Sequence, residues 1–99
     1  MNKIVHERSR LKLLTKLATG KEHMTFTELR DELGMTGGNL SVQLKTLEDA
    51  GYVESVKYFA ENKPRTELSL TESGRAALME YLDELEALLA GLRGNGTNG

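Results

Sequence analysis

The clearest pattern of apolar and polar positions lies in residues 36–50. Three leucines recur there at the i, i+4, i+7 spacing of a helix that buries one face: Leu40, Leu44 and Leu47. Thr36 is a suitable N-cap residue, because its hydroxyl can accept a hydrogen bond from a first-turn N–H group. Gly51 is expected to end the helix, because glycine adopts the left-handed cap conformation without steric cost. The pattern therefore predicts a helix over residues 36–50.

The opposite face of this helix is small and mildly polar. It carries these residues: Gly37, Gly38, Ser41, Val42 and Lys45. Residues 27–33 predict a shorter helix just before it, with Thr27 as the expected cap and Gly34 as the expected end. A short helix, a glycine turn and a second helix make a helix-turn-helix. The second helix of that motif enters the DNA major groove. An ordinary pair of antiparallel helices is the alternative for this segment alone.

A β-hairpin is predicted after the helix-turn-helix. Residues 52–59 are rich in β-branched and aromatic side chains, and residues 66–70 alternate between apolar and polar. Residues 60–65 are expected to form the turn and to carry Lys63 and Arg65. Three helices followed by a hairpin form a winged helix, and an arginine on the wing can reach the DNA backbone or minor groove. Solvated turn charges are the alternative for these two cations.

The first and last helices suggest a second copy of the chain as a partner. Residues 4–19 predict one amphipathic helix, and residues 72–92 predict a long helix with a heptad-like leucine seam. The apolar surface of the long helix is wider than one small domain is expected to cover. A single long capping helix in a monomer is the alternative. The predicted dimer interface comprises Ile4, Val5, Leu78, Tyr81, Leu82, Leu85, Leu88, Leu89 and Leu92.

Composition limits the possible classes of protein. The chain has 99 residues and no cysteine, which excludes disulfides, cysteine metal ligands and cysteine nucleophiles. We expect one domain over residues 1–93 and a disordered tail over residues 94–99. No signal peptide or membrane span is apparent, and a cytoplasmic location is expected. No metal site and no cofactor are predicted.

The charge is unevenly distributed along the chain. Residues 1–65 hold eleven Lys and Arg against nine Asp and Glu, a balance of +2, whereas residues 66–99 carry −4. Phosphate binding depends on the charge near the contact surface, so the net charge of −2 does not exclude a DNA-binding protein.

The run FTELRDELGMTGGNLSVQLKTLEDAGYVE, followed by NKPRTELSLTESGRAAL, resembles small winged-helix transcriptional regulators related to the MarR and ArsR groups. The resemblance covers roughly residues 5 to 90. It implies a homodimer that binds a pseudo-palindromic operator through the second helix and the wing. The cysteines or His/Asp set of ArsR metal sensors are absent, and MarR proteins are longer, with extra helices around a ligand pocket.

The expected function is therefore sequence-specific, homodimeric binding of double-stranded DNA by a transcriptional regulator, a repressor that occludes a promoter. A winged-helix module that docks another protein is the alternative. No carboxylate pair, nucleophile–base set or phosphate loop indicates an enzyme. The sequence does not identify an effector, an operator or a regulated gene. The predicted DNA-binding residues are Thr36, Gly37, Gly38, Asn39, Ser41, Val42, Gln43, Lys45, Lys63 and Arg65.

Overall fold

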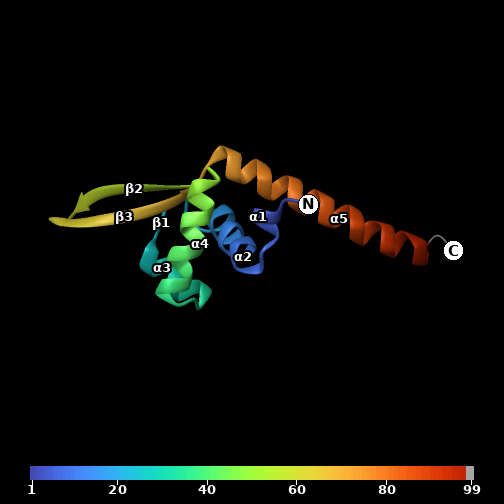
Figure 1. The fold of residues 1–99 in the computed structure, drawn as a ribbon, viewed down its shortest axis with the longest axis horizontal. Coiled ribbons are helices and arrows are strands. Elements are labelled where there is room, and N and C mark those ends of the chain that lie inside the picture. Colours follow the sequence, from blue (N-terminus) through green and yellow to red (C-terminus); the bar gives the residue numbers. More distant parts are fainter. Residues whose placement is uncertain (98–99) are drawn as a thin grey trace.

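A computed structural model describes residues 1–97, which form a mainly α-helical protein with a small antiparallel sheet (Figure 1). The elements in chain order are α1 (Lys3–His6), α2 (Arg8–Thr19), β1 (Met24–Thr25), α3 (Phe26–Leu33), α4 (Gly37–Asp49), β2 (Val53–Ala60), β3 (Lys63–Leu70) and α5 (Glu72–Thr97). The strands lie in the order β1-β3-β2. This arrangement confirms the predicted winged helix-turn-helix, an α+β fold with a long C-terminal helix.

The N-terminal helical segment is divided in two, although the sequence predicts one helix over residues 4–19. Glu7 has an extended backbone, and its carboxylate caps α2 by accepting a hydrogen bond from the N–H of Arg10 at 3.0 Å. Asn2 caps α1 by accepting from the N–H groups of Ile4 and Val5. Each cap satisfies first-turn N–H groups that have no partner within the helix. Local capping therefore stabilises two separate helices.

The helix-turn-helix forms where the sequence predicts it, but α3 begins after Thr25 and not at Thr27. The Thr25 hydroxyl accepts from the N–H of Glu28, whose carboxylate accepts from the N–H of Thr25, both at 3.1 Å. This reciprocal pair is a capping box. A hydrogen bond from Lys21, followed by the backbone bond from Thr25, lowers the pKa of Glu28 to about 2. Gly34 ends α3 with a φ of 65°.

The core is built around the leucine stripe of α4. Thr36 caps this helix, accepting from the N–H of Asn39 at 3.1 Å, as predicted. The three predicted leucines of α4 are at most 5% exposed. They belong to one core that draws on every helix and on the sheet: Val5, Leu13, Leu14, Leu17, Met24, Leu29, Leu40, Leu44, Leu47, Val53, Leu68, Leu78 and Tyr81.

The second strand of the wing is longer, and the turn is tighter, than the sequence predicts. Strands β2 and β3 pair along their whole length, so that Glu61 and Asn62 alone form the turn. Their φ angles of 54° and 61° are both in the left-handed region, as in a type I′ hairpin turn. Lys63 and Arg65 consequently lie in β3, which corrects the predicted six-residue turn over 60–65. A two-residue loop is favoured because its twist matches that of the paired strands.

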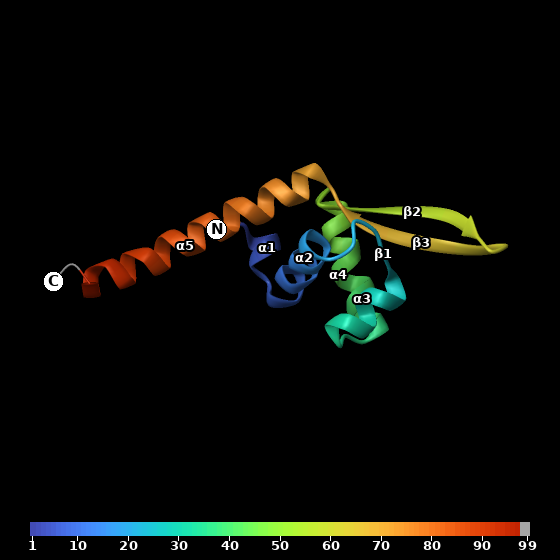
Figure 2. The same ribbon diagram turned by 180° about the vertical axis from the view of Figure 1, so that it is seen from behind.

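Helix α5 has a packed first half and a projecting second half. Leu78 and Tyr81 are buried against the body, whereas Leu88 and Leu92 are 63% and 74% exposed. The second half extends on the side opposite the wing, and the molecule measures 64 × 25 × 21 Å (Figures 1 and 2). The second half of this helix therefore carries apolar surface that the rest of the described chain leaves uncovered.

Val5, Leu78 and Tyr81 of the predicted interface are buried within the same chain, which corrects the prediction for these three residues. The physical reason is that α1 folds back against α5. The Nδ1 atom of His6 lies 2.9 Å from the Tyr81 hydroxyl, and Val5 completes the core below this contact. Ile4 is half-buried and packs against the same core. The prediction of one continuous helix over residues 4–19 left no room for this fold-back.

The C-terminal end of α5 also differs from the prediction. The helix continues to Thr97, so the predicted disordered tail does not begin at residue 94. A helix that is already formed gains one hydrogen bond for each residue added, which offsets the weak helix preference of glycine. The last two residues of that predicted tail, 98 and 99, lie outside the described residues.

Candidate nucleic-acid interface

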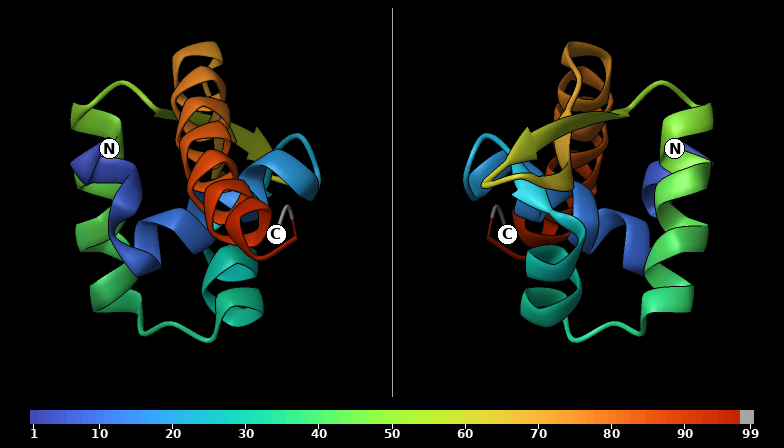
Figure 3. Two further views of the ribbon diagram at one scale, coloured as in Figure 1. Left: turned by 90° about the vertical axis from the view of Figure 1, so that its right-hand side faces the viewer. Right: turned by 90° about the vertical axis from the view of Figure 1, so that its left-hand side faces the viewer.

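The outward face of α4 contains most of the residues that the sequence predicts for DNA binding. Views along the long axis place α4 at an outer edge of the body (Figure 3). Gly37 and Gln43 are half-buried, and Val42, an apolar side chain, is 62% exposed. The exposed members of the predicted set on this helix are Thr36, Gly38, Asn39, Ser41, Val42 and Lys45. The helix thus presents a projecting face to solvent.

The first turn of α4 is open to an approaching anion. The Thr36 hydroxyl accepts a hydrogen bond from the N–H of Asn39. The N–H groups of Gly37 and Gly38 have no acceptor among residues 1–97. A Cβ added at Gly38 would meet nothing within 4 Å. Free N–H groups at the positive end of a helix dipole form a favourable site for a phosphate oxygen. The bare backbone lets such an oxygen come close.

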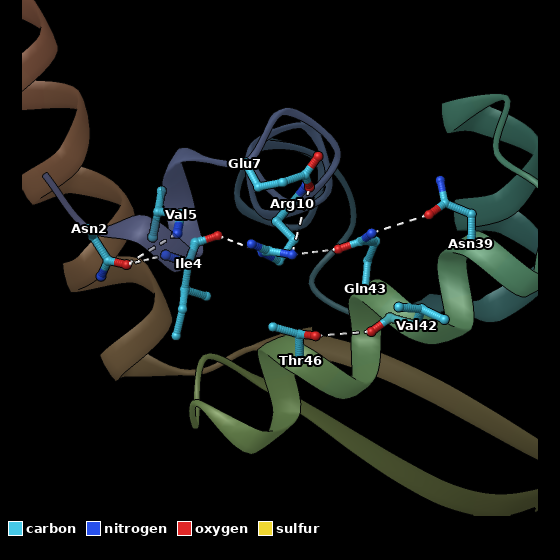
Figure 4. A network of polar contacts seen from close by, with 9 residues as sticks. All are labelled: Asn2, Ile4, Val5, Glu7, Arg10, Asn39, Val42, Gln43 and Thr46. Carbon is cyan, nitrogen blue, oxygen red and sulfur yellow. Dashed lines mark hydrogen bonds and ion pairs between the residues drawn. The ribbon is translucent and has the colours of Figure 1, made fainter.

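One flank of α4 is held by a chain of side-chain hydrogen bonds (Figure 4). Arg10 donates to Oε1 of Gln43 at 2.8 Å, and Nε2 of Gln43 donates to Oδ1 of Asn39 at 3.2 Å. The Nε–H of Arg10 donates to the carbonyl of Ile4 at 2.7 Å. The chain therefore connects two amides on α4 to α2 and to the fold-back of α1.

The other flank of α4 faces the wing across a groove of about 330 Å³. Lys45 lies on this side and pairs with Asp49 at 3.5 Å, with both side chains largely exposed. Such an exposed pair is weak, so Lys45 is available to a phosphate. The groove is lined by Phe26, Ser41, Leu44, Lys45, Glu48, Ser55, Thr66 and Leu68. The contact surface consequently continues from α4 to the wing.

Lys63 and Arg65 are both exposed near the end of the wing. Within the described chain, β1 pairs with β3 only at Glu67 and Leu68, so residues 63–66 form an open strand edge beside the start of α3. Pro64 suits this edge because it has no N–H to pair. The wing therefore presents two cations on its open edge.

Sequence analysis did not find Arg10, which contacts the flank of α4 through Gln43. It lies 33 positions before Gln43, and the packing of α2 on α4 brings the two side chains together. No local spacing marks such a pair, because helical periodicity describes one element at a time. His6 likewise has a partner far along the chain, because its exposed side chain is hydrogen-bonded to Tyr81.

The described residues 1–97 contain neither a metal-binding cluster nor a membrane-spanning helix. No three acidic, histidine or cysteine side chains are grouped there so that they could hold a metal ion. No helix in that range has both the length and the hydropathy needed to cross a membrane.

Comparison with known proteins identifies the family. Residues 9–89 match the family model described as a winged helix DNA-binding domain. The chain is 36% identical over 83 residues to an uncharacterized protein from Methanocaldococcus jannaschii, covering 84% of this chain and 89% of the relative.

Solved structures with the same fold are transcriptional regulators. A transcriptional regulator homologue from Pyrococcus horikoshii has 29% identity and a TM-score of 0.80, covering 90% of this chain and 87% of that one. A protein of the MarR family of transcriptional regulators from Enterococcus faecalis has 27% identity and a TM-score of 0.74, covering 97% and 84%. These matches confirm the predicted resemblance, and this is a family of regulators and not of enzymes. The chain therefore belongs to the winged helix DNA-binding domain family and is a transcription regulator related to the MarR group.

Proposed function

We propose that the protein acts as a homodimer and binds DNA in a sequence-specific manner, with residues 36–50 in the major groove. The observation that carries this proposal is the exposed face of α4, with its capped but bare first turn. The N–H groups of Gly37 and Gly38 would bind a phosphate, Ser41, Asn39 and Gln43 would lie near base edges, and Val42 would contact a thymine methyl group. Lys45 would neutralise a phosphate beside the groove.

The wing supplies the second contact. Lys63 and Arg65 on the open edge of β3 would bind the adjacent backbone or enter the minor groove, where a narrow groove attracts arginine. Two cations per subunit add salt-dependent affinity without reading sequence.

The projecting half of α5 supports the homodimer. Leu82 and Leu85 are half-buried by their own subunit. The more distal leucines of the predicted seam are exposed: Leu88, Leu89 and Leu92. Leucines at heptad-like spacing are typical of a helix that packs on another helix. A second copy would cover them. Ile4 is half-buried against the core of the same chain, and the second copy would cover the part of it that stays exposed.

A twofold dimer fixes how the protein would meet its operator. The two α4 helices would enter successive major grooves about 34 Å apart on a pseudo-palindromic site. Binding there would occlude a promoter, so we propose that the protein is a repressor. We propose a cytoplasmic location for it. A protein-docking module remains the second candidate, because the α4 face includes the bare Gly37–Gly38 pair and the exposed apolar Val42.

The test is to add a negative charge to the proposed contact face. Gly38→Glu places a carboxylate in the first turn of α4, where there is open space and where the helix dipole favours it. The fold should therefore survive, while repulsion from phosphates should weaken binding of labelled operator DNA about tenfold or more.

The matched control is Ser73→Glu, which adds the same charge in the exposed first turn of α5. It should leave operator binding nearly unchanged. The operator is first obtained by selecting bound sequences from a random DNA pool. Equal binding by Gly38→Glu and the wild type at low salt would contradict the placement of α4 in the groove, and failure of the wild type to bind any DNA would favour protein docking.

A further inference from the structure

The hydrogen-bond chain on the flank of α4 has a defined direction, which bears on base recognition if the proposed DNA contact holds. Arg10 lies outside the predicted contact set, yet it is the first donor of the chain (Figure 4). We propose that Arg10 is a positioning residue for sequence specificity. It orients the amides of Gln43 and Asn39 so that Asn39 offers hydrogen-bond donors to a guanine in the major groove.

The first step is that Arg10 fixes the orientation of the Gln43 amide. A guanidinium can only donate hydrogen bonds. The side chain of Arg10 therefore faces the carbonyl oxygen of Gln43, with Nη1 2.8 Å from Oε1. The guanidinium is itself restrained, because its Nε–H donates to the Ile4 carbonyl at 2.7 Å and Glu7 lies 3.9 Å from Nη1. The side chain of Arg10 is 18% exposed, so solvent competes little for these donors.

The second step passes this orientation to Asn39. With its oxygen turned to Arg10, Gln43 directs its Nε2–H groups towards Oδ1 of Asn39, at 3.2 Å. Asn39 must then accept with its oxygen, which leaves its Nδ2–H groups for another partner. Those hydrogens have no acceptor within residues 1–97, and the residue is exposed. Figure 4 shows the Nδ2 atom directed away from Gln43.

The third step concerns the base. Asn39 lies in the first turn of α4, and the N-terminal residues of a recognition helix are nearest to the base edges. A free asparagine pairs with adenine by donating to N7 and accepting from N6. Here Oδ1 already accepts from Gln43, so Asn39 mainly donates. Guanine is the base that offers two acceptors, N7 and O6, side by side in the major groove.

The test compares base preference among variants of the full chain by selection from a random DNA pool. The wild type should select a guanine at one fixed position of each half-site. Arg10→Met removes the donor and keeps much of the side-chain length, and it should reduce the preference for that guanine about tenfold while the rest of the motif persists. Arg10→Lys retains a donor-only group and should keep the preference.

Base preference separates positioning from a general structural role, which would weaken binding to all sequences alike. Thermal unfolding by circular dichroism checks that each variant folds. If Arg10→Met does not fold, Asn39→Asp tests the same idea, because an acceptor-only side chain in the first turn should shift the selected base from guanine to cytosine.

The results distinguish this inference from the proposed function. If the wild type selects a sequence motif but Arg10→Met, or Asn39→Asp, leaves the preference for its guanine unchanged, the positioning role is overturned and sequence-specific binding stands. No selected motif for the wild type would overturn both.

Discussion

At the scale of single residues, Gly74 has less room for a side chain than any other glycine among the described residues. A Cβ at this position would lie 2.1 Å from the carbonyl oxygen of Tyr52. The same carbonyl accepts from the N–H of Thr71, whose hydroxyl accepts from the N–H of Gly74 at 2.9 Å and donates to the Gly51 carbonyl at 2.6 Å. The start of α5 is thereby fixed on the loop that follows α4, and this contact sets the direction of the long helix.

Gly74→Ala should destabilise the protein, because backbone cannot yield to the added methyl group as a flexible side chain can. We expect the free energy of unfolding to fall by about 2 kcal/mol or more. Gly91→Ala is the matched control, since a Cβ there meets nothing within 4 Å and alanine is the better helix former. Denaturant unfolding of both variants measures the difference. Equal stability of Gly74→Ala and the wild type would contradict the close approach of α5 to Tyr52.

At the scale of elements, the wing and α4 offer two separate surfaces for the proposed DNA contact, and a groove joins them. The α4 face is small and carries one exposed cation, Lys45, whereas the wing carries Lys63 and Arg65. Recognition of the DNA base sequence would therefore come mainly from α4, and salt-dependent affinity would come mainly from the wing. The turn at Glu61 and Asn62 is acidic in part, so the cations act from the strand edge and not from the tip.

Arg65→Ala should weaken operator binding and flatten its dependence on salt concentration. Loss of one phosphate contact per subunit should lower the slope of log K against log salt by about one per half-site. Arg75→Ala removes the same charge from an exposed position on the packed half of α5 and should change neither quantity. Titration of labelled operator at several salt concentrations gives both values. An unchanged slope for Arg65→Ala would contradict the proposed contact between the wing and the backbone.

At the scale of the whole molecule, the wing and the projecting half of α5 extend in opposite directions from one small core (Figures 1 and 2). The core and the α4 face are complete within one subunit, while the leucines beyond Leu85 are not covered. A dimer built on α5 would leave both α4 helices free for DNA. Its two half-site contacts would then act together, so that the second binds at a high effective concentration.

The double variant Leu88→Lys and Leu92→Lys should convert the dimer to a monomer, because two charges would be buried in the apolar interface. Sedimentation should report a mass near the 11.0 kDa of one chain. Operator affinity should fall about tenfold or more, since the linked second contact is lost. Val56→Lys is the control. Val56 is an apolar residue of the wing that is 45% exposed, and its replacement should leave the mass of the assembly unchanged. A wild type that is already monomeric would exclude the dimer.

The sequence by itself determined the elements that have a repeating pattern or a local signal. The leucine spacing and the Thr36 cap located α4, and strand alternation located the hairpin, because periodicity and capping depend on neighbours within a few residues. The capping box at Thr25 and Glu28 also has a local sequence signal, a threonine followed three residues later by a glutamate, although the pattern of residues 27–33 predicts Thr27 as the cap. The exposed face of α4, which we propose contacts DNA, also followed from the leucine spacing, because burial of one helix face exposes the other.

Tertiary structure alone decided how these elements meet. The fold-back of α1 moved Val5 into the core, and the packing of α5 divided its apolar surface into a buried part and an uncovered part. The contact between Arg10 and Gln43 joins residues on two helices. None of these features has a period or a local motif, because each depends on the relative placement of elements, which side-chain packing across the whole core determines.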